Sequence, residues 1–400
     1  MNIFLVGNGF DLHHKFPTGY LNFLNTMKFL VENYDDTFTT VAHVFGNEDL
    51  QKTDDFIKDC YDQHSGVYKM TTLPQEKVKD MVNRIKGNSW FQYLCNSVNQ
   101  DIKWIDFEKE ITRVLKAFEG FFKCEKEFIS TREGITFSWA MISIDKEDRC
   151  ILSQFHLFYD LITEDIPRRF RVKKKYVTEN VVGSGEYYIA SDEIVSDLYK
   201  SLRELTDVLK DYLLHFVDAP SNEYSQLGMQ PRFRSLPTPN RVYSFNYTNT
   251  FQILYNNPMV DHIHGNTNTD IVLGINPDET DNVESVDTTF LQFKKYFQRV
   301  FFNTDMDFLQ NMNFARKSPL SNDNRLYVVG HSLDTTDADV IMQIFESVNT
   351  IIVLYHNDTA VKDRIRNLVE IYGKEGLDLL RQKKKLVFLP QSEIQWVAPQ

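Results

Sequence analysis

NIFLVGNGFDLHHKFPT, residues 2–18, is the stretch of this sequence that decides the fold. It begins with a short apolar run, residues 3–6, which is typical of a strand buried on both faces of a parallel sheet. Two glycines around Asn8 then allow a sharp turn and a close approach of bare backbone. Thr18 predicts the N-cap of a helix that begins beside it. Strand, glycine turn and helix start together favour an anion such as a nucleotide phosphate, but without the third glycine of the dinucleotide fingerprint a turn with no ligand is an equal alternative.

Length and composition limit what the chain can be. Its 400 residues are enough for two or three domains, and a hydrophobic content of 42% with 25% charged residues is ordinary for a globular protein. The net charge of −12 argues against broad attraction to nucleic acid or to an anionic membrane. The four cysteines form no CxxC pair, which indicates buried or inert thiols in a reducing compartment. Because no stretch approaches the roughly 20 apolar residues of a membrane span, we expect a cytoplasmic protein with no membrane partner.

The middle of the chain is predicted to be mainly helical. Helical patterns are present in four segments: residues 74–86, 90–98, 105–118 and 135–170. Asp106 and Glu108, at the start of one of these helices, are either acid–base carboxylates or first-turn acids that favour the helix dipole, and the second explanation is preferred. The clearest helix covers residues 191–217, and a proline-rich linker is predicted over 218–240.

A basic run over residues 168–175 precedes a predicted hairpin that ends near residue 190. Such a run could contact RNA, DNA or a partner protein. A solvated charged surface is the more usual explanation, and the acidic total supports it. Nucleic acid is therefore not expected as a ligand.

From residue 241 onward, short apolar strands alternate with helical segments. The predicted strands are residues 242–245, 260–265, 271–274, 326–329, 351–355 and 386–389. This alternation indicates an α/β fold in which helices cover both faces of a parallel sheet. The sequence thus predicts a Rossmann-like domain made of residues 1–36 and 236–400, interrupted by a large, mainly helical insertion of residues 37–235.

Small, amide, hydroxyl and imidazole residues follow five of the predicted strands. They are residues 7–9, 244–248, 262–265, 330–332 and 356–358. Because the carboxyl ends of parallel strands meet at one edge of a sheet, we expect all five segments at one rim. Such a rim suits a polar, anionic ligand that contains a sugar.

Four of these segments resemble, in order, motifs of the sirtuin-like NAD-binding fold. Residues 7–11, GNGFD, with residues 16–18, FPT, are similar to the sirtuin glycine-alanine-glycine turn and the isoleucine-proline-aspartate that follows it. Residues 244–248, SFNYT, are similar to the threonine-glutamine-asparagine-x-aspartate motif. His264 with Gly265 is similar to the histidine-glycine motif, and residues 330–333, GHSL, to the glycine-threonine-serine-leucine motif.

A closer resemblance is to the AbiH family of bacterial phage abortive-infection proteins. It rests on GNGFDLHHKFPTGYLNFL (7–24), Trp104 with DFE (106–108), FNYTNTF (245–251), HIHG (262–265) and VVGHSLDTTD (328–337). The resemblance implies antiphage defence in a bacterial cytoplasm, set off by a phage-encoded trigger. Together with the likeness to sirtuin-like NAD hydrolases of other defence systems, it implies that the protein senses infection and destroys NAD. We expect a homo-oligomer, because an abundant cofactor has to be protected from an enzyme that is always active.

The resemblance also implies which residues form the site. Asn246 would orient the nicotinamide ribose or an attacking water, and His264 would be the general base. NAD would be the substrate or ligand, and no metal is required. The residues implied in binding it are Gly7, Asn8, Gly9, Asp11, Pro17, Thr18, Thr248, Gly265, Gly330, Ser332, His356 and Asn357.

The chain departs from the sirtuin pattern at three points. It has no four-cysteine zinc cluster, so peptide deacylation is not expected. Asp11 replaces a serine near the expected phosphates, where its charge would repel them, so it would cap backbone N–H groups or bind a ribose hydroxyl instead. Thr248 replaces the motif aspartate.

Three functions stay open from the sequence: an NAD glycohydrolase, which is favoured, a nucleotide sensor that binds NAD or ADP-ribose without turnover, and an effector that acts on nucleic acid. Of the other histidines, His262 lies on the same strand face as His264 and is expected to support it, whereas His13 and His14 are expected in solvent.

Overall fold

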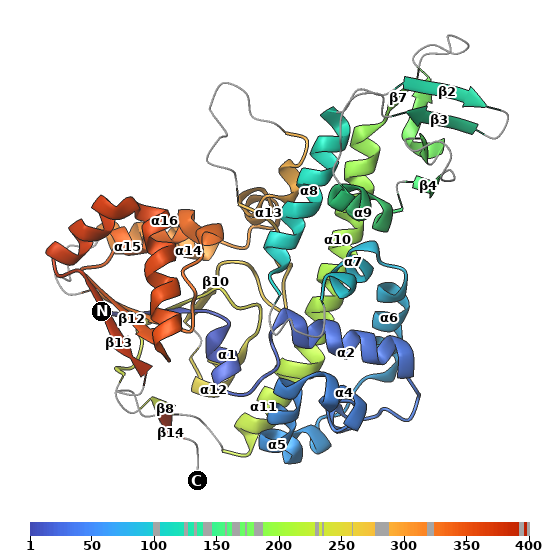
Figure 1. Cartoon of the computed structure of the whole chain (residues 1–400). Helices are drawn as coiled ribbons and strands as arrows, with labels where there is room; N and C mark the ends of the chain where they lie inside the picture. The colour runs from blue at the N-terminus through green and yellow to red at the C-terminus, as the bar shows by residue number, and fades with distance from the viewer. Residues whose placement is uncertain are drawn as a thin grey trace. The chain divides into compact units, whose positions relative to one another are not determined.

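The computed structural model describes most of the chain (Figure 1). The described residues are 1–98, 105–123, 127–131, 134–138, 146–156, 158–161, 169–172, 174–179, 187–228, 232–233, 236–257, 259–276, 288–317, 324–391 and 396–397. The chain divides into two compact units, one of Met1–Val82, Asp207–Asn276 and Lys295–Gln400, the other of Asn83–Thr206 and Pro277–Lys294. The predicted domains divide the chain differently, because they separate the segments that contain the sheet from an insertion. Their boundaries stay a prediction.

The first unit contains a six-stranded sheet in the order β10-β9-β1-β11-β12-β13, in which every neighbouring pair is parallel. The strands are β1 (Asn2–Val6), β9 (Arg241–Ser244), β10 (Val260–His262), β11 (Arg325–Val329), β12 (Thr350–Tyr355) and β13 (Leu386–Pro390). β1 lies in the interior of the sheet, as its apolar run predicts. The coarse prediction of a parallel, Rossmann-like α/β sheet is confirmed, while the sirtuin-like variant of it stays a prediction.

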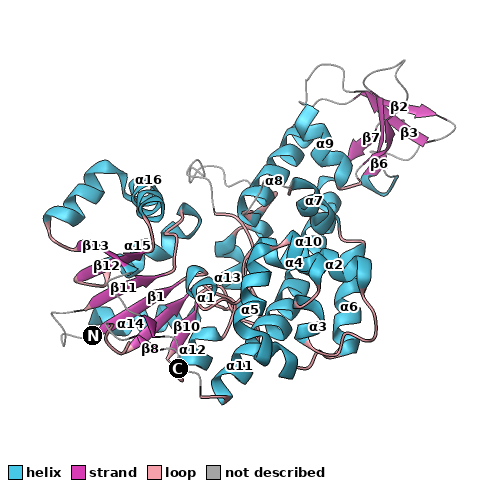
Figure 2. Cartoon of the chain, turned by 60° about the horizontal axis from the view of Figure 1, so that its bottom comes forward, coloured by secondary structure: helices cyan, strands magenta, loops and turns pink. Residues whose placement is uncertain are grey.

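Successive side chains of each strand point to opposite sides of the sheet, so the apolar strands present an apolar surface on both faces. Helices cover both of these faces. Ile3 and Leu5 belong to one apolar core, shared with α14 (Met306–Lys317), α15 (Ala338–Glu346) and α16 (Asp358–Gln382). Phe4 and Val6 belong to the other core, shared with the short helices α1 (Gly9–His13) and α12 (Thr250–Tyr255). Figure 2 shows α15 and α16 beside the strands.

One predicted strand is wrong, and its place in the packing explains why. Residues 271–274 are buried but form no strand. The N–H of Leu273 donates to Gln298 Oε1, and Gln298 Nε2 donates to the Leu273 carbonyl, both over 3.0 Å. Gln298 belongs to α13 (Lys295–Phe302). A side-chain amide thus bonds the backbone groups that a neighbouring strand would otherwise bond.

The linker predicted over residues 218–240 is wrong in its first part. α10 (Ser191–Leu213) confirms the long predicted helix, and a π-helical turn (Leu214–Asp218) leads directly into α11 (Ala219–Gln226). Pro220 directly follows the π-helical turn, so the helical backbone continues through a residue that has no N–H to donate to the preceding turn. A proline cluster alone therefore does not mark the end of helical structure here.

The first unit also contains a series of helices within residues 20–86, of which the first and the last correspond to predicted helices. They are α2 (Tyr20–Asn33), α3 (Val41–Phe45), α4 (Glu48–Thr53), α5 (Asp55–Met70) and α6 (Gln75–Lys86), which begins in this unit. The N-cap of α2 is Gly19, so the prediction that Thr18 caps this helix is wrong. Thr18 instead donates to Asn8 Oδ1 over 2.5 Å, which holds the glycine turn. Strands β8 (Arg232–Phe233) and β14 (Trp396–Val397) form a short antiparallel pair.

The second unit combines helices with an antiparallel sheet. Its helices include α7 (Ser89–Ser97), α8 (Phe107–Lys123), α9 (Lys146–Gln154) and the first part of α10. Its sheet has the order β2 (Glu127–Thr131), β3 (Gly134–Ser138), β5 (Arg169–Val172), β4 (Phe158–Leu161). A helix over 135–170 is therefore wrong, because three strands lie there beside α9. The predicted hairpin is confirmed by the antiparallel pair β6 (Val177–Glu179) and β7 (Tyr187–Ile189).

Candidate functional site

The carboxyl ends of β10, β9, β1 and β11 lie next to one another at one edge of the sheet. Val6 pairs with Ser244 on one side and with Val329 on the other, and Ser244 pairs with His262. The turn that follows β1 is tied to the strand end of β11, since Gly7 N donates to the Val329 carbonyl over 3.1 Å. The polar segments after these four strands are thereby brought together.

Three of the predicted glycines bring two of the strand-end turns into backbone contact. Gly9 N donates to the Gly330 carbonyl over 2.8 Å. A Cβ on Gly330, whose φ is +71°, would lie 2.2 Å from Phe10 N, and a Cβ on Gly7 would lie 2.6 Å from the Cα of His331. Only glycine permits both the positive φ and this approach. The turns therefore need these glycines for packing, and their role toward a phosphate stays a prediction.

A buried cluster of oxygen atoms surrounds Asp11. Asp11 Oδ2 accepts a hydrogen bond from Thr248 Oγ1 over 2.5 Å. Asp11 Oδ1, Asn246 Oδ1 and Thr250 Oγ1 are buried, and none makes a hydrogen bond of ordinary geometry with the described residues. Burial raises the pKa of Asp11 to about 7, the charge of Asp218 adds to the rise, and the Thr248 hydroxyl opposes it. The Thr250 hydroxyl and the Asn246 side chain also lie close enough to Asp11 to oppose the rise. Asn246 Oδ1 is a buried acceptor in this cluster that a ligand hydroxyl can bind.

Asp218 holds the adjoining loops together, although no sequence motif points to it. Its Oδ1 accepts from Asn249 N, and its Oδ2 from Asn249 Nδ2, both over 2.8 Å. Thr267 Oγ1 donates to the same Oδ2 over 2.5 Å. Burial raises the pKa of Asp218 to about 6, while these hydrogen bonds oppose the rise. The residue joins the start of α11 to the segments after β9 and β10.

The second cluster is built on His264, which is 3% exposed. Its Nε2 lies 2.9 Å from Asp337 Oδ1, and Lys295 Nζ lies 2.8 Å from the same oxygen. The Nδ1 of His264 is buried and has no partner among the described residues. Burial lowers the pKa of His264 to about 4, against the effect of Asp337. The ring is therefore neutral near pH 7, with its proton on Nε2 toward Asp337 and a lone pair on Nδ1.

Asp337 is ionised in spite of its burial. Burial would raise its pKa, but the charge of Lys295 and the hydrogen bond from His264 hold the pKa of this carboxyl well below its usual range. Its other oxygen, Oδ2, lies 3.6 Å from His331 Nε2. His331 Nδ1 accepts from Leu333 N over 2.8 Å, which leaves Nε2 as the protonated nitrogen. Asp337 ends the VVGHSLDTTD segment and could have been singled out there, whereas Lys295 carried no sequence signal.

Asn246 and His264, the two residues expected to be catalytic, take part in different clusters at this edge. Asn246 lies with Asp11, while His264 lies with Asp337, and the ring of Phe245 packs against His264 with centroids 5.3 Å apart. His262 turns to the Asn246 carbonyl, 3.0 Å from its Nδ1, and to Gln252. The expectation that His262 supports His264 is therefore wrong, because His262 contacts the backbone of Asn246 instead.

The remaining predicted residues have structural partners or are exposed. The carbonyl of Pro17 accepts from Tyr212 OH over 2.7 Å. Gly265 has a φ of +74°, and a Cβ there would meet the Asp270 carbonyl. Ser332 and His356 are exposed, and Asn357 caps α16 by accepting from Ala360 N over 2.8 Å. No observation assigns these residues to a ligand, so their binding roles stay predictions.

Two other expectations about side chains are settled. His13 is exposed, but His14 is not in solvent, because its Nδ1 lies 2.8 Å from the Phe10 carbonyl and its Nε2 lies 3.2 Å from Tyr255 OH. Asp106 accepts from the N–H groups of Glu108 and Lys109, so it is a helix cap, as the preferred explanation held.

The cysteines differ in exposure. Cys60 is buried, and burial raises the pKa of its thiol far above the usual range, whereas Cys150 is exposed. Cys95 is half-buried, and Cys124 lies outside the described residues. Burial therefore holds for Cys60 and not for Cys150, and whether the exposed Cys150 thiol is inert stays a prediction.

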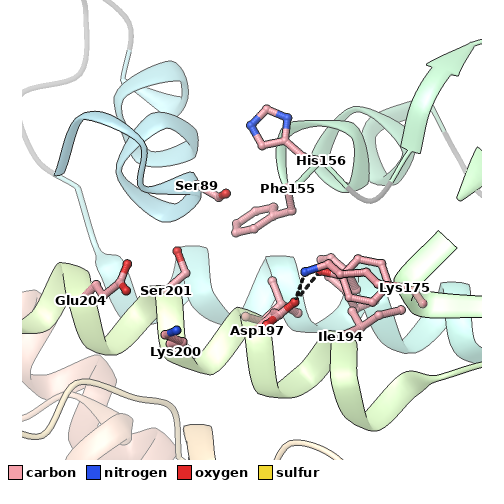
Figure 3. A pocket seen from close by; sticks show the side chains of 12 residues that line it. Ser89, Phe155, His156, Lys175, Ile194, Asp197, Lys200, Ser201 and Glu204 are labelled. Atoms are coloured by element: carbon pink, nitrogen blue, oxygen red, sulfur yellow. Dashed lines mark hydrogen bonds and ion pairs between the residues drawn. The ribbon is translucent and has the colours of Figure 1, made fainter. Parts of the chain in front are cut away.

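A cavity of about 270 Å³ lies in the second unit (Figure 3). α10 contributes Asp197, Ser201 and Glu204 to its lining. Lys175 Nζ and Tyr176 OH bind Asp197 Oδ2 over 2.5 and 2.7 Å. No residue of the predicted site lines this cavity. Lys175 is also the member of the basic run over 168–175 whose side chain the structure describes, and its charge is paired.

Within the described ranges, no group of three His, Cys, Asp or Glu side chains has an arrangement suited to a metal ion, and the predicted absence of a metal stays a prediction. The same part of the chain contains no helix with the length and apolar character needed to cross a membrane.

Comparison with known proteins identifies the family to which this chain belongs. Residues 3–356 match the family model described as "Bacteriophage abortive infection AbiH", which covers nearly the whole chain. A search of curated proteins and a search of solved structures gave no match.

Proposed function

The chain belongs to the AbiH family of bacteriophage abortive infection, and on that premise we propose that it defends cells by hydrolysing NAD at the bond between nicotinamide and ribose. The family supports a role in phage defence, and the choice of reaction is ours. One observation carries it: a buried, neutral His264 is oriented by Asp337 and keeps an unpartnered Nδ1, at the sheet edge that also holds the Asp11 cluster. An imidazole held through one nitrogen with the other free is the arrangement of a proton acceptor.

The reaction needs little more than positioning and one proton acceptor. The bond between ribose C1′ and the nicotinamide nitrogen breaks, and its electron pair neutralises the positive ring of the leaving nicotinamide. A water oxygen bonds to C1′, and one proton of that water passes to His264 Nδ1 and then to solvent. The products are ADP-ribose, nicotinamide and a proton. The oxocarbenium-like centre is strongly electrophilic, so a weak base that orients the water is sufficient.

The Asp11 cluster suits the sugar better than the pyrophosphate. Asp11 Oδ1 and Asn246 Oδ1 are acceptors, which ribose hydroxyls can satisfy and phosphate oxygens cannot. An ionised Asp11 would also stabilise the positive charge that develops on the ribose. The sirtuin motif has an aspartate where this chain has Thr248, and here Thr248 is bonded to Asp11. We infer that Asp11 supplies the negative charge that Thr248 does not.

The test is nicotinamide release from NAD by the purified protein, with NAD measured in parallel in infected cells. We expect His264→Ala to lower the release rate by at least about 100-fold, the usual range for loss of a general base. Asn246→Ala should also lower it. His43→Ala is the matched control, because His43 is an exposed histidine of α3 and should leave the rate unchanged.

Circular dichroism and thermal unfolding establish whether the variants are folded. If infected cells stay protected while their NAD stays intact, the proposed reaction is wrong. If both folded site variants cleave NAD at the wild-type rate, the reaction occurs but His264 and Asn246 do not carry it.

A nucleotide sensor without turnover is the second candidate, and the low basicity of His264 favours it. In that case NAD or ADP-ribose would bind to the wild-type protein in a calorimeter, Asn246→Ala would weaken the binding, and no nicotinamide would appear. An action on nucleic acid has no comparable support. In the basic run over 168–175, the side chain that the structure describes is Lys175, and it is paired with Asp197.

A further inference from the structure

α13 has its polar side chains inward and its apolar side chains outward. Lys295 and Gln298 are at most 1% exposed, whereas Tyr296 is 60% and Phe301 is 66% exposed. A surface helix ordinarily has the reverse arrangement. Burial of a lysine is unfavourable unless a charged partner compensates it, so the inward face of α13 points to a specific electrostatic task.

The partner of Lys295 is the carboxylate that also binds His264. Lys295 Nζ and His264 Nε2 lie 2.8 and 2.9 Å from the same oxygen, Asp337 Oδ1. His331 faces the other oxygen of Asp337 at 3.6 Å. Arg299, one turn along α13, forms an ion pair with Asp339. Its positive charge also lowers the pKa of His264. The charged and titratable groups that face the His264 ring are thus Asp337 and His331 from one segment, and Lys295 and Arg299 from α13.

We propose that Lys295 is a positioning residue for the proposed NAD hydrolysis: it fixes the Asp337 carboxylate, and so holds His264 as the neutral ring with Nδ1 available as the acceptor. The inference rests on the proposed function for its catalytic meaning, whereas the effect on the His264 ring is a property of the fold and is measured independently.

Charge explains why a cation is needed at this position. A buried carboxylate beside an imidazole favours the protonated, positive ring, in which both nitrogens are donors and neither can accept a proton. The ammonium of Lys295 offsets the charge of Asp337 and repels a second cation on the same oxygen. Lys295 thus adds to the effect of burial, which is the larger cause of the neutral ring. Without Lys295, Asp337 would favour the imidazolium more strongly, and the pH at which the ring becomes protonated would rise.

The test compares Lys295→Met with Lys295→Arg, and uses Lys362→Met, an exposed lysine of α16, as the control. The protonation of the His264 ring is followed by nitrogen NMR as the pH is changed. Nicotinamide release is measured over the same pH range.

In Lys295→Met we expect the titration of His264 to move up by about one pH unit or more, the size of shift that loss of a nearby charge produces. The acid limb of the nicotinamide-release profile should move by the same amount. Lys295→Arg and Lys362→Met should titrate as the wild type does. Lys295→Gln, which is neutral but still able to donate to Asp337, gives a second measurement if the methionine variant fails to fold.

An unchanged His264 titration in a folded Lys295→Met or Lys295→Gln protein would overturn the proposal. If the wild-type protein releases no nicotinamide, the proposed function fails, while the NMR titration still decides the role of Lys295. If nicotinamide is released and the titration does not move, only the role of Lys295 is wrong.

Discussion

Replacing Asp11 by asparagine should stabilise the protein at neutral pH. Burial raises the pKa of Asp11 from 3.8 to about 7. Between these values the folded protein holds a proton that the unfolded chain has lost, so stability falls as the pH rises through this window, and the full cost is present above about pH 7. A shift of about three units corresponds to about 4 kcal/mol, which is the upper limit of what Asp11→Asn can gain.

An asparagine fits the position without leaving a new polar atom unpaired. Its side-chain oxygen can accept from Thr248, as Asp11 Oδ2 does. Its NH₂ group can donate to Asn246 Oδ1 or Thr250 Oγ1, both of which have no partner of ordinary geometry. The substitution therefore removes a buried charge, while its NH₂ group takes the place of a carboxylate oxygen beside Thr250 and Asn246.

The free energy of unfolding is measured by urea denaturation at about pH 8 and at about pH 4, on either side of most of the window in which the buried carboxyl titrates. Asp62→Asn, on the exposed face of α5, is the control and should change stability by less than about 0.5 kcal/mol. We expect Asp11→Asn to be more stable than the wild type at the higher pH and nearly equal to it at the lower pH. Equal or lower stability at about pH 8, or the same gain at both pH values, would refute the reasoning. Loss of nicotinamide release in this stabilised variant would identify Asp11 as a charge kept for function.

Three further predictions concern the packing. Gly330→Ala should destabilise the first unit by about 3 kcal/mol or more, because its Cβ would meet Phe10 N. Gly66→Ala is the control, since Gly66 has open space around it, and it should change stability by at most about 1 kcal/mol. Similar unfolding midpoints for the two variants would contradict the contact between the two turns. Gln298→Leu should cost about 2–4 kcal/mol in urea denaturation, since it leaves two buried backbone groups of Leu273 unpaired, and a loss below about 1 kcal/mol would show that other groups bond them. Asp197→Asn should cost less than about 1 kcal/mol in thermal unfolding, because the ion pair that it breaks is about half exposed, and a larger loss would mean that the pair supports the cavity.

Local sequence patterns were sufficient to predict the parallel sheet and the edge at which its polar residues gather. Residues 3–6 form a strand that is buried on both faces, and such a pattern is local, because burial of successive side chains follows from their own apolar character. The strand ends are marked by the residues that interrupt the apolar runs, so their meeting at one edge follows from parallel pairing alone. The motifs at these ends were also sufficient to identify the family. By contrast, residues 271–274 have the pattern of a strand but take their hydrogen bonds from Gln298.

Which charged side chains contact one another depends on how distant segments pack together. His264 and Asp337 are 73 residues apart in the chain, and Lys295 and Asp337 are 42 apart. Nothing in the local pattern around Lys295 distinguishes it from a surface lysine, since its burial results from how α13 packs rather than from its neighbours in sequence. The same holds for Asp218, which lay in a predicted linker and yet bonds three donor groups from two loops. The pKa of a buried group depends on the distance to other charges and on the exclusion of water, and both exist only once distant segments are packed together.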